Sequence, residues 1–236
     1  MFIVLLVCCI IYIDMGGKTS KIKADYSGIN IFSLSIVFVV ASFLAFMFEG
    51  LWSVISFGHW DNHNALVWGP FTIIYGFAVV GLLLLYPYYG KRRMLDQFLI
   101  CFLFGSIFEF GASWLQEFAF GTRSWNYYHL PFNLDGRICL RMSIVWAVVG
   151  VVFLRLFAAK IINLLRKFNS RTIFNVGFVV FVFLICDFTV SAFAIIRFSG
   201  RHYGIPPDGA LEQLIDARFP DERMRKIYYN MEFVER

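Results

Sequence analysis

Long apolar runs occupy most of this chain of 236 residues, and they constrain its fold more than any motif does. Hydrophobic residues make up 59% of the chain and charged residues only 16%, whereas soluble domains carry about 25% charged residues. A membrane-spanning helix needs about 20 apolar residues, so the length accommodates five or six spans and no separate soluble domain. The sequence therefore predicts an all-α fold, a polytopic transmembrane helical bundle of five or six spans with a polar C-terminal tail.

Five apolar segments have the length of membrane-spanning helices. They run over about residues 31–57, 69–86, 95–120, 138–165 and 172–196. A sixth segment, Met1 to Ile13, would be about 20 Å long as a helix, which is short of the roughly 30 Å hydrocarbon core. We expect a short or partly interfacial helix there. The predicted division of the chain is a bundle over residues 1–196 and a polar C-terminal tail over residues 197–236.

Basic residues cluster next to alternate ends of the predicted helices. The three clusters are Lys18, Lys21 and Lys23; Lys91, Arg92 and Arg93; and Lys160, Arg166, Lys167 and Arg171. Clusters of this kind mark the cytoplasmic face of a membrane protein. The opposite face then holds the loops at 59–68 and 121–137 and the tail. We attribute the net charge of +5 to orientation and to anionic lipid headgroups, and expect no binding of nucleic acid.

Four carboxylates lie inside the predicted spans: Glu49, Glu109, Glu117 and Asp187. An acid in hydrocarbon costs a few kcal/mol unless it pairs, is protonated or faces water, so such residues mark functional sites. Helical rise places Glu49, Glu109 and Asp187 in the half of the membrane opposite the basic loops. We expect a polar cavity or substrate pathway that opens on that face.

Arg141, one turn after Arg137 at the start of the fifth segment, is the expected counter-charge. About 21 Å of helix separates it from the next basic residue, so it should lie below the headgroups and pair with Glu109 or Glu117. Small polar residues recur at helical spacing beside Glu49 and Glu109, which predicts faces that pack on other helices. The structural alternative is that buried acid–arginine pairs and small-residue stripes only fix helix register.

The loop at 121–137 combines aromatic and polar side chains. Its aromatic residues fit either an interfacial belt or a lid or binding loop. Arginine and amide groups in it can hydrogen-bond a lipid headgroup or a substrate phosphate. The candidate binding residues are Arg123, Trp125, Asn126, Asn133 and Arg137.

The string His59-Trp-Asp61-Asn-His63 offers imidazole and carboxylate groups but matches no zinc signature, so we expect a polar loop and no metal. The five cysteines lack C-x-x-C spacing and are expected to be packing residues. The sequence also has no P-loop, nucleophile elbow, zincin motif or dinucleotide fingerprint. We therefore expect no cofactor, and any ATP must be bound by another chain.

Several stretches resemble one family of membrane proteins. They are WGPFTIIYG (68–76), GTRSWNY (121–127), PFNLDGRICL (131–140), FPDERM (219–224) and YNMEF (229–233). Together they resemble the CmpB-like family of bacterial membrane proteins labelled putative ABC-transporter type IV permeases, over about residues 36–233. The resemblance implies a multi-pass protein of the bacterial cytoplasmic membrane. The residues that carry the family motifs are Gly69, Pro70, Tyr75, Gly76, Pro131 and Gly136.

Three functions follow from these observations. The first is a permease-like membrane subunit with a carboxylate-lined cavity, whose partners are the lipid bilayer, a separate ATPase subunit and further copies of itself. The second is a membrane-embedded cell-envelope enzyme or lipid-binding factor that acts on a phosphate-bearing lipid, with Glu49 or Glu109 as general base. No catalytic motif supports it, so we expect a protein that is not an enzyme. The third is an accessory scaffold subunit.

Overall fold

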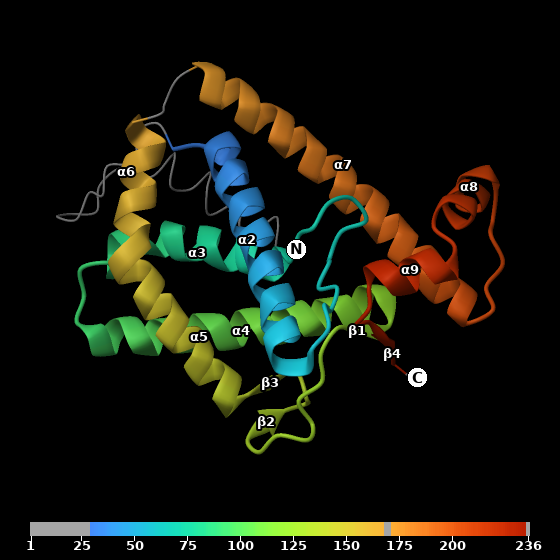
Figure 1. Ribbon diagram of the computed structural model, residues 1–236, viewed down its shortest axis with the longest axis horizontal. Coiled ribbons are helices and arrows are strands. Elements are labelled where there is room, and N and C mark those ends of the chain that lie inside the picture. The colour runs from blue at the N-terminus through green and yellow to red at the C-terminus, as the bar shows by residue number, and fades with distance from the viewer. Residues whose placement is uncertain (1–28, 168–170, 235–236) are drawn as a thin grey trace.

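The computed structural model describes residues 29–167 and 171–234, which are mainly helical (Figure 1). The prediction for Met1 to Ile13 lies outside these residues. The bundle consists of α2 (Ile31–Phe57), α3 (Ile73–Tyr89), α4 (Met94–Phe120), α5 (Leu140–Phe153), the π-helical turn η1 (Leu154–Ala158), α6 (Ala159–Lys167) and α7 (Arg171–His202). The C-terminal part contains α8 (Ala210–Arg218) and α9 (Asp221–Ile227). The four short strands are β1 (Thr122–Arg123), β2 (Asn133–Leu134), β3 (Ile138–Cys139) and β4 (Glu232–Phe233).

Four helices in the described residues are long and apolar enough to cross a membrane. They are α2, α4, the continuous helix from α5 to α6, and α7, and α3 is a shorter apolar helix. These helices confirm the predicted all-α class and the bundle of membrane-spanning helices. The expected third segment began at Gly69, but its helix begins only at Ile73, because Gly69 has a positive φ of 85° and Pro70 follows it.

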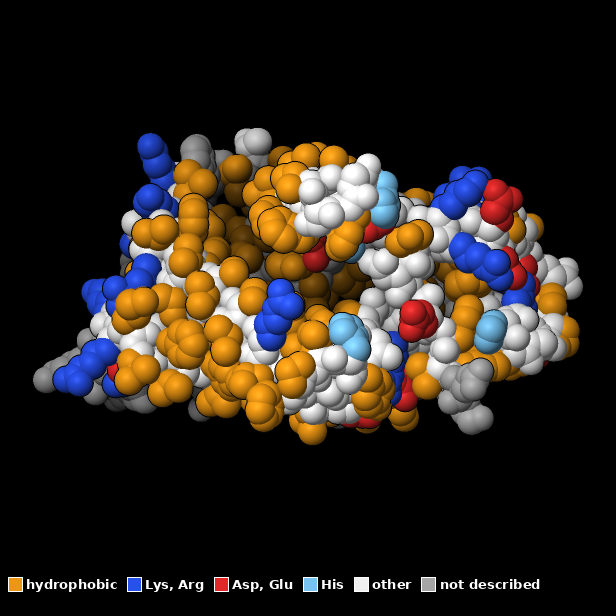
Figure 2. Space-filling model, turned by 60° about the horizontal axis from the view of Figure 1, so that its bottom comes forward, with side chains coloured by type: hydrophobic (Ala, Val, Ile, Leu, Met, Phe, Trp, Pro, Cys, Tyr) orange, Lys and Arg blue, Asp and Glu red, His pale blue; other side chains and the backbone are white. Residues whose placement is uncertain are grey.

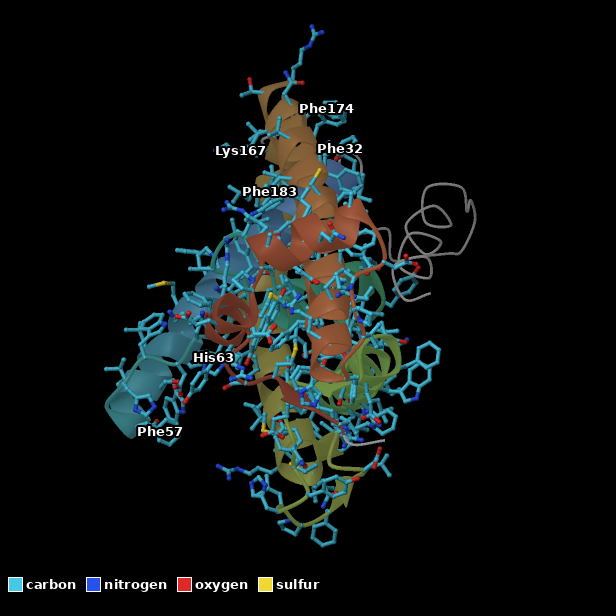
Figure 3. The ribbon with its side chains drawn as sticks, turned by 90° about the vertical axis from the view of Figure 1, so that its right-hand side faces the viewer. Phe32, Phe57, His63, Lys167, Phe174 and Phe183 are labelled. Atoms are coloured by element: carbon cyan, nitrogen blue, oxygen red, sulfur yellow. The ribbon has the colours of Figure 1, made fainter. Side chains whose placement is uncertain are left out.

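The helix ends lie in two groups, one beside the basic clusters and one beside the long loops. The turn from α3 to α4 and the connection from α6 to α7, both next to basic clusters, lie toward the left of Figure 1. Phe32, Lys167 and Phe174 lie at one end of the molecule in Figure 3, and Phe57 lies at the other. Strand β1 of the 121–137 loop pairs with β4 near the C-terminus. The long loops and the C-terminal part therefore share the end opposite the basic clusters.

Local signals define α2. The Asn30 side chain accepts the backbone N–H of Ser33 at 3.0 Å, and the Ser33 hydroxyl accepts the backbone N–H of Asn30 at 3.1 Å. This reciprocal cap satisfies two of the N–H groups that every helix start leaves without partners. The helix ends at Gly58, whose φ of 78° is the left-handed conformation that closes many helices.

Small residues let the helices approach closely. A Cβ atom on Gly76 would lie 2.9 Å from the Phe38 ring, so α3 lies against α2 with no room for a side chain. A Cβ on Gly150 would lie 2.7 Å from Cys101, which does the same for α5 and α4. In a bilayer such close packing replaces the hydrophobic effect as the force that holds helices together. The polar stripe predicted on α2 also packs inward, since Ser35, Ser42 and Ser53 are buried.

The fifth predicted segment differs from one regular helix. Residues Ile138–Cys139 form β3, and η1 interrupts the helix at Leu154–Ala158. Within η1, the Arg155 Nε donates to Gln97 Oε1 at 2.8 Å. The Gln97 amide in turn donates to the carbonyl oxygens of Tyr89 and Gly90, both at 3.0 Å. The π-turn thus places Arg155 against Gln97, and the Gln97 amide connects it to the C-terminal end of α3.

The C-terminal part folds onto the end of α7 and onto the 58–72 loop. Its buried core includes Phe219 and Met224, which lie against α7 residues such as Ala194. Arg197 of α7 is only 4% exposed and pairs with Asp216 of α8 at 2.8 Å. Two bonds from arginine side chains, the second from Arg201, lower the pKa of Asp216. Buried apolar contacts and ion pairs therefore hold this polar segment in place.

Candidate functional site

Glu109 of α4 is 3% exposed and binds neutral donors only. Its Oε1 accepts the Tyr127 hydroxyl at 2.8 Å, and its Oε2 accepts the Trp146 indole N–H at 2.5 Å. Burial and the neighbouring carboxylate raise the pKa of Tyr127, which keeps this side chain a hydroxyl donor. Within the described residues no lysine or arginine forms an ion pair with Glu109. Its negative charge is therefore uncompensated unless a proton or a cation binds.

Glu49 of α2 has similar surroundings. Its Oε1 accepts the Tyr75 hydroxyl at 3.0 Å. Its Oε2 is buried without a hydrogen-bond partner, and the nearest group that can carry positive charge is the His63 ring, with Nδ1 3.8 Å away. A buried oxygen without a partner costs about 1–3 kcal/mol, more if charged. Such an atom is therefore a candidate contact for a ligand.

The two acids meet through an aromatic pair. The rings of Tyr75 and Trp146 lie 5.5 Å apart between centroids, and each ring donates its polar hydrogen to a different acid. We call Glu49, Tyr75, Glu109, Tyr127 and Trp146 the acid–aromatic cluster. Its members come from α2, α3, α4, the 121–137 loop and α5. Residues distant in sequence thus form one polar group inside the bundle.

The 58–72 loop and the C-terminal part reach this cluster through His63. The Asn230 amide lies 3.0 Å from His63 Nδ1, and the Thr72 hydroxyl donates to the His63 carbonyl at 3.0 Å. The neighbouring Asn62 amide donates to the Lys226 carbonyl at 2.7 Å. The sequence predicts a polar loop for the string from His59 to His63. The structure places one of its histidines beside an intramembrane acid.

Figure 2 shows a hollow near the centre of one face of the molecule. Acidic and histidine side chains lie at the wall of the hollow, while apolar side chains cover much of the surface beside it. Polar groups therefore reach into the molecule between apolar helices. This arrangement is expected when a bundle carries polar chemistry inside a membrane.

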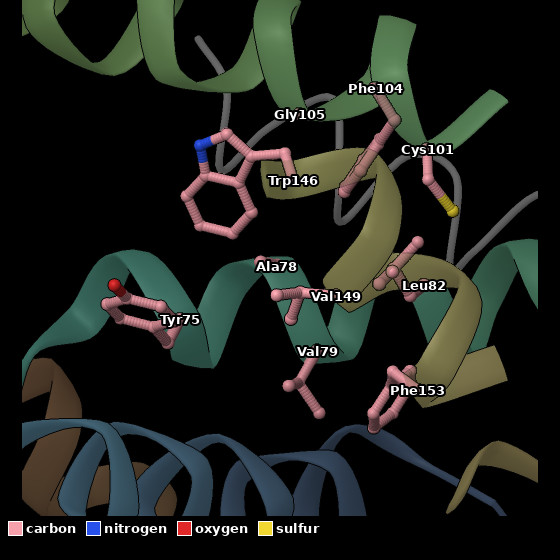
Figure 4. A pocket seen from close by; sticks show the side chains of 11 residues that line it. Tyr75, Ala78, Val79, Leu82, Cys101, Phe104, Gly105, Trp146, Val149 and Phe153 are labelled. Atoms are coloured by element: carbon pink, nitrogen blue, oxygen red, sulfur yellow. The ribbon is translucent and has the colours of Figure 1, made fainter. Parts of the chain in front are cut away.

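An apolar pocket of about 60 Å³ adjoins the acid–aromatic cluster. Tyr75 and Trp146 lie at one end of it, and Phe153 lies toward the other end (Figure 4). Helices α3, α4 and α5 all contribute to the lining, for example through Ala78 and Phe104. The ring surfaces of the aromatic pair thus contact the pocket while their polar atoms bind the two acids.

Glu117 belongs to a different group at the end of α4. It pairs with Arg137 Nη2 at 2.9 Å and with Arg123 Nε. Arg137 Nε also contacts Asp135 Oδ2 at 2.7 Å, and Arg123 Nη2 lies 3.6 Å from the same oxygen. We call these four residues the charge network, in which two acids compensate two arginines. The bond that Arg123 donates to Glu117 raises the pKa of Arg123, and the bonds from the Tyr128 hydroxyl and Arg137 lower the pKa of Asp135.

The pairing predicted for Arg141 is wrong. Arg141 is exposed, and among the described residues it forms no ion pair with Glu109 or Glu117. The reason is the start of α5 at Leu140, which leaves Arg137 in a turn before β3. Arg137 and Arg141 therefore do not share a helix face, and of these two arginines it is Arg137 that pairs with Glu117.

The other candidate residues of the 121–137 loop hold the loop together. The Trp125 indole donates to the Arg137 carbonyl at 3.0 Å, and the Asn126 side chain accepts a backbone N–H at 2.9 Å. Asn133 accepts the Gly136 N–H at 3.1 Å and donates to a backbone carbonyl at 2.8 Å. Gly136 has a φ of 62°, which requires glycine-like freedom at this turn. The side chains of Trp125, Asn126 and Asn133 thus form hydrogen bonds with the backbone of their own loop.

Asp187 of α7 is fully buried in a third polar group. Its Oδ1 accepts the Trp68 backbone N–H at 3.2 Å and the Ser191 hydroxyl at 3.1 Å. Ser191 also accepts the Val67 N–H at 2.9 Å. One turn of α7 thus binds two backbone groups of the 58–72 loop, directly before Gly69. The structure brings two of the four acids together and places the other two in separate groups.

The side chains that the structure describes are poorly placed to coordinate a metal ion. His59 Nε2 lies 3.2 Å from Asp61 Oδ1 in an exposed pair. No group of three or more histidine, cysteine, aspartate or glutamate side chains within residues 29–167 and 171–234 is placed to hold a metal ion.

The sequence did not connect three residues at or beside the cluster with its acids: Tyr127, Trp146 and His63. Aromatic residues near apolar runs fit an interfacial belt equally well, so their type carries no information about the acids they bind. Tyr75 stood out only through a family motif. The partner of a buried carboxylate depends on how helices are arranged around the bundle, which periodicity does not encode.

A family model decides the relationship of this chain to known proteins. The family described as "Putative ABC-transporter type IV", also called CmpB, matches residues 36–192. The chain belongs to this family. The match to the CmpB family confirms the resemblance found in the sequence and includes every residue of the acid–aromatic cluster. Comparison with curated proteins and with solved structures gives no match.

Proposed function

We propose that this CmpB-family membrane protein is the permease-like subunit of a transport system in the bacterial cytoplasmic membrane. The acid–aromatic cluster forms part of its solute pathway. One observation carries the proposal: Glu49 and Glu109, on separate helices, converge on one aromatic pair, and arginine and lysine do not neutralise either acid in the described residues. An acid that only fixes the register of packed helices is expected to pair with a basic side chain, as Glu117 does with Arg137.

The position of the cluster supports this proposal. Glu49 and Glu109 lie past the midpoints of α2 (Ile31–Phe57) and α4 (Met94–Phe120), toward the helix ends that lead into the 58–72 and 121–137 loops. His63 of the first loop lies beside Glu49. A solute that enters from this side meets carboxylates and aromatic faces before it reaches the basic side. The pathway therefore begins with negative groups and selects against anions.

A separate ATPase would supply energy, because the sequence has no nucleotide-binding motif of its own. The basic side between Arg155 and Arg171 offers a surface for such a partner. Arg166 and Lys167 lie in the last turn of α6, where positive charge is favoured by the helix dipole. We assign docking of the ATPase to this end.

The phosphate-lipid alternative receives less support from the geometry. Its clamp requires Arg123 and Arg137 to face a ligand, but both are engaged by Glu117 and Asp135. A phosphate would have to displace two carboxylates from these arginines. The acid–aromatic cluster requires no such exchange.

The test is a purification of the tagged protein from its native membrane in mild detergent, followed by mass spectrometry of proteins and lipids. A stoichiometric ATPase subunit is the expected result. It should also copurify with the Glu109→Gln variant, because that substitution is far from the basic side. A specific phospholipid or lipid-linked precursor bound in place of any ATPase would overturn the proposal and favour the lipid-handling function.

A further inference from the structure

The apolar pocket beside the acid–aromatic cluster has the features of a binding site for part of a small molecule. Its lining is apolar almost throughout, and its polar end is the pair Tyr75 and Trp146. Val149 in the lining is 51% exposed among the described residues, so the pocket reaches the outer surface of the helices. A ligand can thus place an apolar group in the pocket and a polar group at the aromatic pair.

The acids beside the aromatic end of the pocket favour a cation there. Tyr75 and Trp146 line the pocket, and the polar hydrogen of each side chain binds a carboxylate outside it. The face of an aromatic ring attracts a cation, and two acids behind the rings add to the negative potential. Glu49 and Glu109 do not line the pocket themselves, so their negative potential reaches it from behind the aromatic pair. A carboxylate or phosphate in the pocket would be repelled.

Volume limits the apolar part of the ligand. The pocket provides about 60 Å³, and one water-sized group occupies roughly 10–15 Å³ on this measure. The space therefore suits an apolar chain of about four to six heavy atoms. A lipid acyl chain is much longer and would leave most of its length outside.

We propose that the pocket and the acid–aromatic cluster together bind a small organic cation, an amine with a short apolar group of about five carbons. The amine lies against Tyr75 and Trp146, the carboxylates of Glu49 and Glu109 behind these side chains attract its charge at longer range, and the apolar group fills the pocket. This proposal rests on the proposed transport function and names its substrate class.

A matched series of probes tests the proposal without knowledge of the natural substrate. Pentylammonium, 1-pentanol and pentanoate share one chain length and differ in the head group. Binding to the purified protein in nanodiscs is measured by saturation-transfer difference NMR and by tryptophan fluorescence. Pentylammonium should bind saturably, pentanol about tenfold more weakly because it lacks the charge, and pentanoate not detectably.

Two valines provide a matched pair of variants. Val148 and Val149 are adjacent on α5 and are 50% and 51% exposed, but only Val149 lines the pocket. Val149→Phe should fill the pocket and abolish saturable binding, and Val148→Phe should retain it. Both exposed positions accept a larger side chain without a change in the core. Partition of the probe into lipid is the same for both variants, so the difference reports the pocket.

The acids provide the second comparison. The double variant Glu49→Gln with Glu109→Gln should reduce the affinity for pentylammonium to that for pentanol. Equal affinities of the wild type for pentylammonium and pentanol, or equal binding by the two phenylalanine variants, would overturn the proposed substrate class. Failure of the transport proposal is distinguishable, because binding of pentylammonium to a protein that copurifies with no ATPase would retain the site and reject the permease subunit.

Discussion

Glu109 and Glu117 lie two turns apart on α4 and have opposite surroundings. Glu109 is buried and accepts hydrogen bonds from a tyrosine and a tryptophan. Glu117, at the end of the helix, pairs with Arg123 and Arg137. The negative charge of Glu109 thus has no arginine or lysine partner in the described residues, whereas two arginines compensate the charge of Glu117.

This difference is why we propose Glu109 as a functional acid and Glu117 as a structural one. A carboxylate held by two arginines keeps its charge, and a ligand must break those pairs to reach it. A carboxylate that accepts only neutral donors can gain a proton or a cation without losing a partner. Both acids lie within a predicted span, so membrane depth alone does not distinguish them. Their partners do.

The largest expected effect is on function, from neutralising Glu109. Glu109→Gln should abolish the contribution of the protein to the growth of its native host, while the amount of folded protein in the membrane stays close to that of the wild type. Glutamine retains the shape and one acceptor oxygen, so the change in stability should be within about 1 kcal/mol. Competitive growth and size-exclusion chromatography in detergent measure the two effects.

Glu117→Gln is the matched control on the same helix. It should retain function and lose stability, because it leaves Arg123 and Arg137 with less negative charge. The opposite pattern, with function lost at Glu117 and retained at Glu109, would show that the charge network is the working site.

The next effect in size is the loss of Arg137 from the charge network. Arg137→Met leaves Glu117 and Asp135 with only Arg123, and breaking a largely buried pair of this kind should cost about 3 kcal/mol of unfolding free energy. Thermal unfolding in detergent measures the loss. Arg141→Met is the control. Arg141 is exposed and forms no ion pair with the residues that the structure describes, so its loss should change stability by less than about 0.5 kcal/mol. Equal losses for both arginines would contradict the assigned pairing.

These comparisons show why some features were predictable and others were not. The long apolar runs determine the class and the helices, since hydrocarbon leaves a chain few alternatives. The polar stripe on α2, with Ser42 and Ser53, follows from helical spacing alone. The pairing of Arg141 failed because one assumption, that the helix began before Leu140, rotated two arginines onto a common face. A shift of two residues in a helix start is enough to change the partner of a charge.

The acid–aromatic cluster could be predicted only in part. The two acids are visible in the sequence because charge is rare in apolar runs. Trp146 and Tyr127 are not visible, because an aromatic residue in or beside a span has many roles. The contact between Tyr75 and Trp146 depends on the order of helices around the bundle, and no local pattern specifies that order.

A smaller effect should come from the hydrogen bonds to Glu109. Tyr127→Phe removes the donor to Oε1 and leaves that buried oxygen without a partner, which should cost about 1 kcal/mol. Thermal unfolding at neutral pH checks the value. Tyr229→Phe is the control, since Tyr229 is 60% exposed and should have no measurable effect. A loss of stability at Tyr229 equal to that at Tyr127 would contradict the assigned bond.

The smallest expected effect is the part of the pH dependence of stability that Asp135 of the charge network contributes. The Tyr128 hydroxyl and Arg137 lower the pKa of Asp135. A group whose pKa is lower in the folded state contributes stability above its unfolded pKa, about 3.9, and loses it as the pH falls through the folded value. Because Asp135 is partly exposed, the contribution should be only about 0.5–1 kcal/mol at pH 7.

Replacement of Asp135 isolates this contribution. Wild type and Asp135→Asn should differ in melting temperature at pH 7, and the difference should shrink as the pH falls below about 4. Asp208→Asn, at an exposed position of the C-terminal part, should show no such difference at any pH. A gap between wild type and Asp135→Asn that stays constant into acid would mean that the aspartate acts through its shape and hydrogen bonds. In that case Arg137 would depend on Glu117 alone for its compensating charge, and the loss from Glu117→Gln should approach that from Arg137→Met.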